Sequence, residues 1–157
     1  MKYLFLDIDG VLNHDKWYDS KRMKELSPTF VRWEQECFDP ECVQRVNRIL
    51  KETGAELVVS SSWRGDPELS EIFESVGLPT NYSVTPIVDI ANWVYYEHRG
   101  REIEAFIQVF PCDNYVILDD DTDFTEEQLK NHFVHCSNKD GLTEEKTNQA
   151  IKILNNE

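Results

Sequence analysis

The stretch LDIDG, residues 6–10, closes the first apolar run of the chain and places Asp7 and Asp9 two residues apart, with Ile8 between them. Two carboxylates at one strand end repel each other and lose hydration, so a fold tolerates them mainly where a cation or a reaction needs both. The run from Tyr3 to Ile8 holds β-forming residues and precedes the turn residue Gly10, which predicts a buried strand. We therefore expect a functional site at the C-terminal end of this strand.

Further apolar runs and helical patterns follow in alternation. The runs 56–60 and 115–118 predict buried strands, and Asp39-Pro40-Glu41 is typical of a helix start that leads to a helix end at Gly54. Additional helices are predicted over 68–76, over 101–109 and from 143 onward, with strands within 81–90 and near 133–134. Strands that alternate with helices predict an α/β fold with a parallel sheet.

The chain has 157 residues, of which 40% are hydrophobic, and this predicts a single domain over 1–157. Residues 14–38 show no clean periodicity and are interpreted as a small insertion. Acidic residues outnumber basic ones 30 to 16, for a formal net charge of -14. That charge disfavours passive attraction to nucleic acid or to anionic membranes, so a phosphorylated substrate needs local positive charge.

The chain shows neither a signal-peptide pattern nor a membrane-spanning run, so we expect a cytoplasmic protein without membrane contact. Four cysteines without a CxxC pair predict reduced thiols. His132, His135 and Cys136 lie close in sequence and suggest zinc, but no tetrahedral set completes them, and packing at a strand end is the favoured interpretation. No pattern indicates an oligomeric state.

Three predicted strands end in reactive side chains. Asp7 and Asp9 end the first, Ser60 the second, and Asp119 and Asp120 the run that begins at residue 115. In an open parallel sheet, ligands bind beyond the carboxyl ends of the strands. Any one of these residues is an ordinary turn former, but their convergence on one edge predicts a catalytic or binding site.

The segments LDIDGVLN (6–13), SSSWR (60–64), RGREI (99–103) and ILDDD (117–121), in this order, resemble the haloacid dehalogenase (HAD) superfamily of phosphohydrolases. The resemblance spans nearly the whole chain. More narrowly, the four segments are similar to the small HAD domains of Swiss-army-knife RNA repair proteins. The resemblance implies a three-layer, Rossmann-like α/β fold with a parallel sheet and a minimal cap.

The resemblance also implies catalytic roles. Asp7 is the expected nucleophile that forms an aspartyl-phosphate, and Asp9 is expected to protonate the leaving alcohol and then to activate water. Mg²⁺ is the expected cofactor, held by the Asp7 carboxylate, the Asp9 backbone carbonyl and Asp120, with Asp119 orienting the set.

The substrate contacts keep alternatives open. Ser60 matches the hydroxyl that binds a phosphate oxygen, and Ser61 is the close alternative. Arg99 and Arg101 compete as the phosphate-neutralising cation, with Arg99 favoured because it precedes Gly100. Arg64 is a candidate second phosphate or substrate contact, against the alternative of a surface salt bridge.

We expect a Mg²⁺-dependent phosphomonoesterase that acts on a nucleotide or a nucleic-acid end, because a small cap leaves room for bulky phosphates. The alternatives are a small-metabolite phosphatase and a non-catalytic, Mg²⁺-binding interaction domain. Base stacking is a candidate role for four aromatic residues, with core or rim packing as the alternative: Trp17, Tyr18, Trp63 and Trp93.

Overall fold

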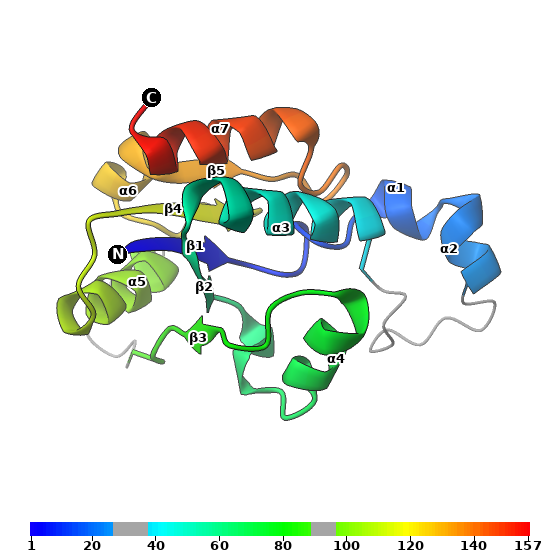
Figure 1. Cartoon of the computed structure of the whole chain (residues 1–157), viewed down its shortest axis with the longest axis horizontal. Helices are drawn as coiled ribbons and strands as arrows, with labels where there is room; N and C mark the ends of the chain where they lie inside the picture. The colour runs from blue at the N-terminus through cyan, green and yellow to red at the C-terminus, as the bar shows by residue number, and fades with distance from the viewer. Residues whose placement is uncertain (27–37, 89–96) are drawn as a thin grey trace.

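The computed structural model describes residues 1–26, 38–88 and 97–157. Within these ranges the chain forms a sheet of parallel strands in the order β3-β2-β1-β4-β5 (Figure 1). The strands are β1 (Lys2–Leu6), β2 (Glu56–Val59), β3 (Ser83–Val84), β4 (Asn114–Asp119) and β5 (Phe133–His135). The chain adds strands on one side of β1 and then returns to add β4 on the other side. Sheets of this topology bind ligands where the strand order reverses, which here is the carboxyl end of β1 and β4.

Helices cover both faces of the sheet. They are α1 (Asp15–Tyr18), α2 (Lys21–Leu26), α3 (Pro40–Thr53), α4 (Leu69–Val76), α5 (His98–Val109), α6 (Glu126–Asn131) and α7 (Glu144–Asn155), with a 3-10 turn η2 (Ser62–Gly65). Helices α3 and α7 lie side by side in Figure 1, and their residues pack with Leu4 and Leu6 of β1. Helix α5 packs on the opposite face, where Ile103 joins Tyr3 and Phe5 in a second apolar cluster. The predicted three-layer α/β fold with a parallel sheet is confirmed.

The ends of α3 agree with the sequence prediction. The Asp39 carboxylate accepts a hydrogen bond from the Glu41 backbone N–H, and Pro40 occupies the first helical position, where no intrahelical hydrogen bond is lost. At the other end Gly54 adopts a left-handed conformation with φ of 70°, which closes the helix.

Two predicted elements differ from the structure, and one helix was not predicted. The strand expected within 81–90 is only β3, because beyond the bond from Thr85 N–H to the Val59 carbonyl the chain leaves the sheet; residues 89–90 lie outside the described part. Helix α5 begins at His98 rather than at 101. Helix α6 was missed, although Thr125 and Gln128 form a capping box that marks its start.

The interpreted insertion 14–38 is described only in part. Residues 15–26 form α1 and α2, which lie beyond the carboxyl end of β1 in Figure 1, and residues 27–37 lie outside the described ranges. The single-domain organisation over 1–157 and the limits of the insertion stay predictions. In the described ranges no helix has the length and apolar character needed to cross a membrane.

Candidate active site at the carboxyl edge of the sheet

The parallel register brings three predicted site residues into one row. Leu6 of β1 pairs with Val59 of β2 and with Leu118 of β4, so the next residues are Asp7, Ser60 and Asp119. Two backbone hydrogen bonds continue the ladders past Leu6, from Asp7 N–H to the Leu118 carbonyl and from Ser60 N–H to the Leu6 carbonyl, both 2.9 Å. Because side chains alternate along a strand, the row continues the side of Tyr3 and Phe5, which α5 covers.

Three carboxylates gather at this edge. Oxygens of Asp7, Asp119 and Asp120 all lie within 4.8 Å of one another. Burial is the main cause that raises the pKa of Asp7, and neighbouring Asp120 raises it further, against the Ile8 backbone N–H and Arg99. Burial and the charge of Asp7 likewise raise the pKa of Asp119. Three carboxylates so close together repel one another, and a bound cation would offset that repulsion. Carboxylate oxygens are hard ligands that suit Mg²⁺, which accepts two or three protein oxygens and keeps several waters.

Asp9 lies next to this cluster but is held differently. One carboxylate oxygen accepts a hydrogen bond from the Asn13 side-chain amide and the other from the Trp63 indole N–H, both at 2.9 Å. Asn13 in turn accepts a hydrogen bond from the Gly10 N–H. Both oxygens of Asp9 are thus oriented by neutral donors, an arrangement suited to a group that exchanges protons. The assignment of its backbone carbonyl as a metal ligand stays a prediction.

Gly10 allows the loop after β1 to approach the acidic cluster. Its φ of 81° is left-handed, and a Cβ atom added there would lie 2.6 Å from Asn138 Oδ1 and 2.7 Å from Asp120 Cβ. Only a residue without a side chain fits both the conformation and the space. The Gly10 turn therefore packs directly on Asp120.

The two candidate serines have different surroundings. Ser61 is engaged as the N-cap of η2, since its hydroxyl accepts a hydrogen bond from the Trp63 backbone N–H. The Ser60 hydroxyl is buried, and within the described part of the chain it has no hydrogen-bond partner. A buried hydroxyl without a partner is costly unless a ligand supplies one, so Ser60 fits the phosphate-binding role better than Ser61 does.

The two candidate arginines of α5 also differ. Burial raises the pKa values of Asp7 and Asp119, and the positive charge of Arg99 opposes that rise, so Arg99 lies near the acidic cluster. Arg101 instead binds Glu97 and Glu104 at 2.6 and 2.8 Å. The first turn of α5 is held in place by the loop after β4, because the Gly100 N–H donates to the Asp123 carbonyl and Gln128 donates to the Gly100 carbonyl.

Arg64 is part of a buried ion pair rather than a surface salt bridge. Its guanidinium donates to a carboxylate oxygen of Glu102 at 2.8 Å, and the two side chains are 10% and 0% exposed. Sequence reasoning missed Glu102, which also contacts Arg99 and His98. The available signal was the helical spacing of Arg99, Glu102 and Ile103, which places a charge on the buried face of α5.

Two of the four aromatic residues considered for base stacking, Trp17 and Trp63, belong to the core. Trp17 and Trp63 are each 5% exposed, and Trp63 packs on Phe38. Their interpretation as core residues is confirmed, whereas Trp93 lies outside the described residues. Tyr18 is partly exposed and lines a pocket of about 260 Å³ together with Asp9.

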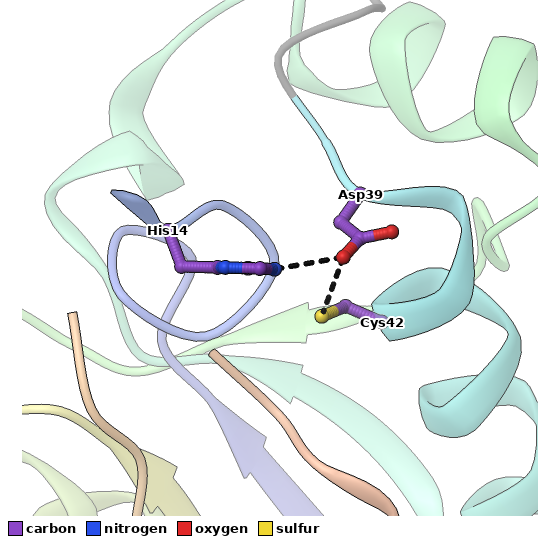
Figure 2. Close-up of side chains that lie close together, drawn as sticks. All are labelled: His14, Asp39 and Cys42. Carbon is purple, nitrogen blue, oxygen red and sulfur yellow. Dashed lines mark hydrogen bonds and ion pairs between the residues drawn. The ribbon is translucent and has the colours of Figure 1, made fainter. Parts of the chain in front are cut away.

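A second polar cluster joins the two ends of the insertion. Figure 2 shows His14 and Cys42 directed at the same oxygen of Asp39, with His14 Nε2 at 2.7 Å and Cys42 Sγ at 3.8 Å. Burial and the charge of Asp39 raise the pKa of Cys42 to about 12, so the thiol is a donor. The three groups are close enough for a metal, but each already has a hydrogen-bond partner. We interpret the cluster as a hydrogen-bonded connection.

The residues of the zinc alternative do not converge in the described structure. His132 Nδ1 contacts the Tyr115 carbonyl and His135 Nε2 contacts the Asp120 carbonyl, both at 2.9 Å, whereas buried Cys136 donates to the Val134 carbonyl. The favoured interpretation, packing at a strand end, agrees with these contacts. Cys42, Cys112 and Cys136 are free thiols, as predicted.

Comparison with known proteins agrees with the fold and with the order of the site segments. Neither the curated proteins nor the solved structures gave a match. The family model described as "HAD domain in Swiss Army Knife RNA repair proteins" matches residues 3–147, which include β1 to β5 and every candidate site residue. With its parallel α/β sheet and acidic strand ends, the chain belongs to this family of HAD domains.

Proposed function

We propose that this protein is a Mg²⁺-dependent phosphomonoesterase that removes a phosphoryl group from a nucleic-acid end or a nucleotide through an aspartyl-phosphate at Asp7. Membership of the HAD family supports a phosphohydrolase-type role. The observation that carries the proposal is the row of Asp7, Ser60 and Asp119, in which crowded carboxylates lie beside a buried hydroxyl without a partner in the described chain.

Each residue of the site has a chemical role in this proposal. Asp7 attacks phosphorus and forms the acyl phosphate, while Asp9, oriented by Asn13 and Trp63, protonates the leaving oxygen and later takes a proton from water. Ser60 donates its hydroxyl to a non-bridging phosphoryl oxygen, and Arg99 neutralises charge on that group. Asp7, the Asp9 backbone carbonyl and Asp120 would hold Mg²⁺, with Asp119 orienting the set, and the ion would screen the negative charges of nucleophile and phosphate.

The proposed substrate class rests on the matched family, on the volume of the pocket beside Asp9 and on the net charge of the chain. The matched family is described by its place in RNA repair proteins, which supports a phosphorylated nucleic-acid end. The pocket beside Asp9 is about 260 Å³, large enough for part of a nucleotide. A net charge of -14 opposes binding along a polynucleotide, because such binding is mostly phosphate neutralisation. We propose cytoplasmic action on a terminal phosphate rather than on an internal one.

The first test is phosphate release from an aryl phosphate with and without Mg²⁺. Asp7→Asn keeps the size of the side chain but not its nucleophilicity, so turnover falls to background in a folded protein. Asp9→Asn lowers kcat by about 10²–10⁴-fold, because a general acid and base is lost. Asp121→Asn removes the same charge from an exposed neighbour and leaves kcat unchanged.

Retained turnover in folded Asp7→Asn would remove the aspartyl-phosphate mechanism. A screen of 3′- and 5′-phosphorylated oligonucleotides, mononucleotides and sugar phosphates then assigns the substrate. Preference for sugar phosphates indicates a small-metabolite phosphatase. Mg²⁺ binding without turnover on any of these esters indicates an interaction domain.

A further inference from the structure

Helix α5 contains a fully buried carboxylate. The Glu102 side chain has 0% exposure, and glutamate is almost never buried in this way unless other groups compensate its charge. Its neighbours Ile103 and Phe106 belong to the apolar core on the same face of the sheet. Glu102 is therefore a charge placed next to the core, and its contacts explain how the fold tolerates it.

Glu102 contacts two arginines and a histidine through its two carboxylate oxygens. Arg64 Nη2 donates to Oε1 at 2.8 Å, Arg99 Nη1 donates to Oε2 at 3.2 Å, and His98 Nε2 lies 3.3 Å from Oε1. Arg64 comes from η2, four residues after Ser60, whereas Arg99 comes from the first turn of α5. One carboxylate thus links a basic group of η2, the turn that follows Ser60, to a basic group of α5.

The basic groups retain unused hydrogen-bonding capacity. Within the described part of the chain, the Arg64 Nε–H is buried without a hydrogen-bond partner, as is the Ser60 hydroxyl. Two guanidinium groups against one Glu102 carboxylate leave a net positive charge in a protein with a net charge of -14. Unpaired donors and local positive charge are the properties that bind an anion.

A purely structural role explains these contacts less well. An apolar side chain of similar volume stabilises a core as well as a buried ion pair does, or better, so stability alone does not call for Glu102. Arginine side chains are long and flexible, and they recognise phosphate through a planar fork whose orientation must be set. A buried carboxylate that contacts two guanidinium groups sets both orientations at once.

We propose that Glu102 is a positioning residue that holds Arg64 and Arg99 as a joint binding site for the phosphoryl group of the substrate. The proposal rests on the function proposed above, and it extends that function from the single cation Arg99 to a pair with a shared anchor. Glu102 itself does not touch the substrate. It acts by restricting the two guanidinium groups to orientations in which their remaining N–H groups face the anion.

The test uses inorganic phosphate as the probe and calorimetry on the full chain with saturating Mg²⁺. Glu102→Gln keeps the size of the side chain but loses its charge and one acceptor, so we expect the Kd for phosphate to rise at least tenfold with unchanged Mg²⁺ affinity. Glu104→Gln is the matched control on the same helix, because Glu104 pairs with Arg101, and its Kd stays at the wild-type value.

A double-mutant cycle separates positioning from a general structural effect. If Glu102 acts through the two arginines, adding Glu102→Gln to an Arg64→Met/Arg99→Met protein raises the Kd for phosphate by less than twofold. A full tenfold effect in that background would overturn the proposal. So would a folded Glu102→Gln protein that binds phosphate within twofold of wild type.

A second variant covers the case in which Glu102→Gln does not fold. Arg64→Met leaves Glu102 paired with Arg99 and His98, and we expect its Kd for phosphate to rise at least fivefold; an unchanged Kd overturns the proposal. Phosphate binding that depends on Glu102 in a protein without turnover supports this inference while the proposed function fails. Turnover with phosphate binding that is independent of Glu102 contradicts only this inference.

Discussion

Asp7 and Asp9 are two residues apart, yet their surroundings assign them different chemistry. Asp7 lies among carboxylates, where burial and Asp120 raise its pKa. Asp9 receives hydrogen bonds on both oxygens from neutral donors, Asn13 and Trp63. A bound cation would favour the ionised form of Asp7, whereas the donors that orient Asp9 carry no positive charge. The single intervening residue, Ile8, is fully buried.

At the residue scale, Gly10→Ala tests the close approach of the first loop to Asp120. We expect a loss of stability of about 1–3 kcal/mol from the left-handed φ and the crowding, together with a higher Mg²⁺ requirement for turnover. Urea unfolding and Mg²⁺ titrations measure the two effects.

Gly54→Ala is the matched control for Gly10→Ala. Gly54 also has a left-handed φ, of 70°, but a Cβ atom added there meets no atom within 4 Å. Gly54→Ala therefore measures only the cost of the left-handed conformation, a loss of about 1–2 kcal/mol in the free energy of unfolding, and we expect its Mg²⁺ dependence to be unchanged. Equal Mg²⁺ dependence in the two variants would contradict the role assigned to Gly10.

At the scale of elements, a hydrogen bond between His14 and Asp39 connects the loop after β1 to the start of α3, at the two ends of the interpreted insertion. His14 is the N-cap of α1, Asp39 is the N-cap of α3, and the two side chains bind each other. Burial acts to raise the pKa of Asp39, but hydrogen bonds from His14 and the Glu41 N–H outweigh it and lower the pKa. The ionised form is therefore bound more tightly in the folded chain than in the unfolded one.

Asp39→Asn keeps the capping oxygen but removes the charge, so we expect a loss of about 1–3 kcal/mol at pH 7. A carboxyl whose pKa is lower in the folded state contributes stability above its unfolded pKa of about 3.9. That contribution is lost as the pH falls below this value, so the difference between wild type and Asp39→Asn narrows between about pH 4 and pH 3.

Urea unfolding at pH 7, 4 and 3, followed by tryptophan fluorescence, checks this prediction. Asp140→Asn is the control, because Asp140 forms an exposed ion pair with Lys16, and we expect a change within about 0.5 kcal/mol. A constant difference between wild type and Asp39→Asn from pH 7 to pH 3 would show that the charge of Asp39 does not stabilise this connection.

At the scale of the whole molecule, we expect cation binding to stabilise the fold, because the chain has an acidic excess. The net charge is -14, and three of the carboxylates share one edge of the sheet. A ligand that binds only the folded state at about 100 times its Kd contributes about 2.7 kcal/mol. For a chain of this size that corresponds to a rise in Tm of about 5–10 °C.

Thermal unfolding of metal-free protein with added Mg²⁺ measures this effect. We expect the rise in Tm in wild type and in Asp121→Asn, and a smaller rise at the same Mg²⁺ concentration in Asp120→Asn, which lacks one cluster oxygen charge. An identical Mg²⁺ response in Asp120→Asn and wild type would exclude Asp120 from the metal site.

Features that depend on neighbours along the chain could be read from the sequence alone. The caps of α3, a buried strand just before Asp7 and the alternation of strands and helices follow from local patterns, and all were predicted. Two errors arose where local signals are weak, because β3 forms only two residues at the sheet edge and α5 starts at His98, earlier than its apolar spacing indicated. Helix α6 was missed despite the local signal of its capping box.

The contacts between polar groups that are distant in sequence depend on the tertiary structure. The bond from Trp63 to Asp9 joins residues 54 positions apart, and the pair Arg64–Glu102 joins residues 38 apart. No periodicity in the sequence encodes such contacts, because they depend on strand register and on how α5 packs against the sheet. The order of strands and polar residues along the sequence therefore predicts which groups reach the carboxyl edge of the sheet. Packing determines their contacts: within the described chain the Ser60 hydroxyl has no hydrogen-bond partner, Arg99 lies near the acidic cluster, and Glu102 pairs with Arg64 and Arg99.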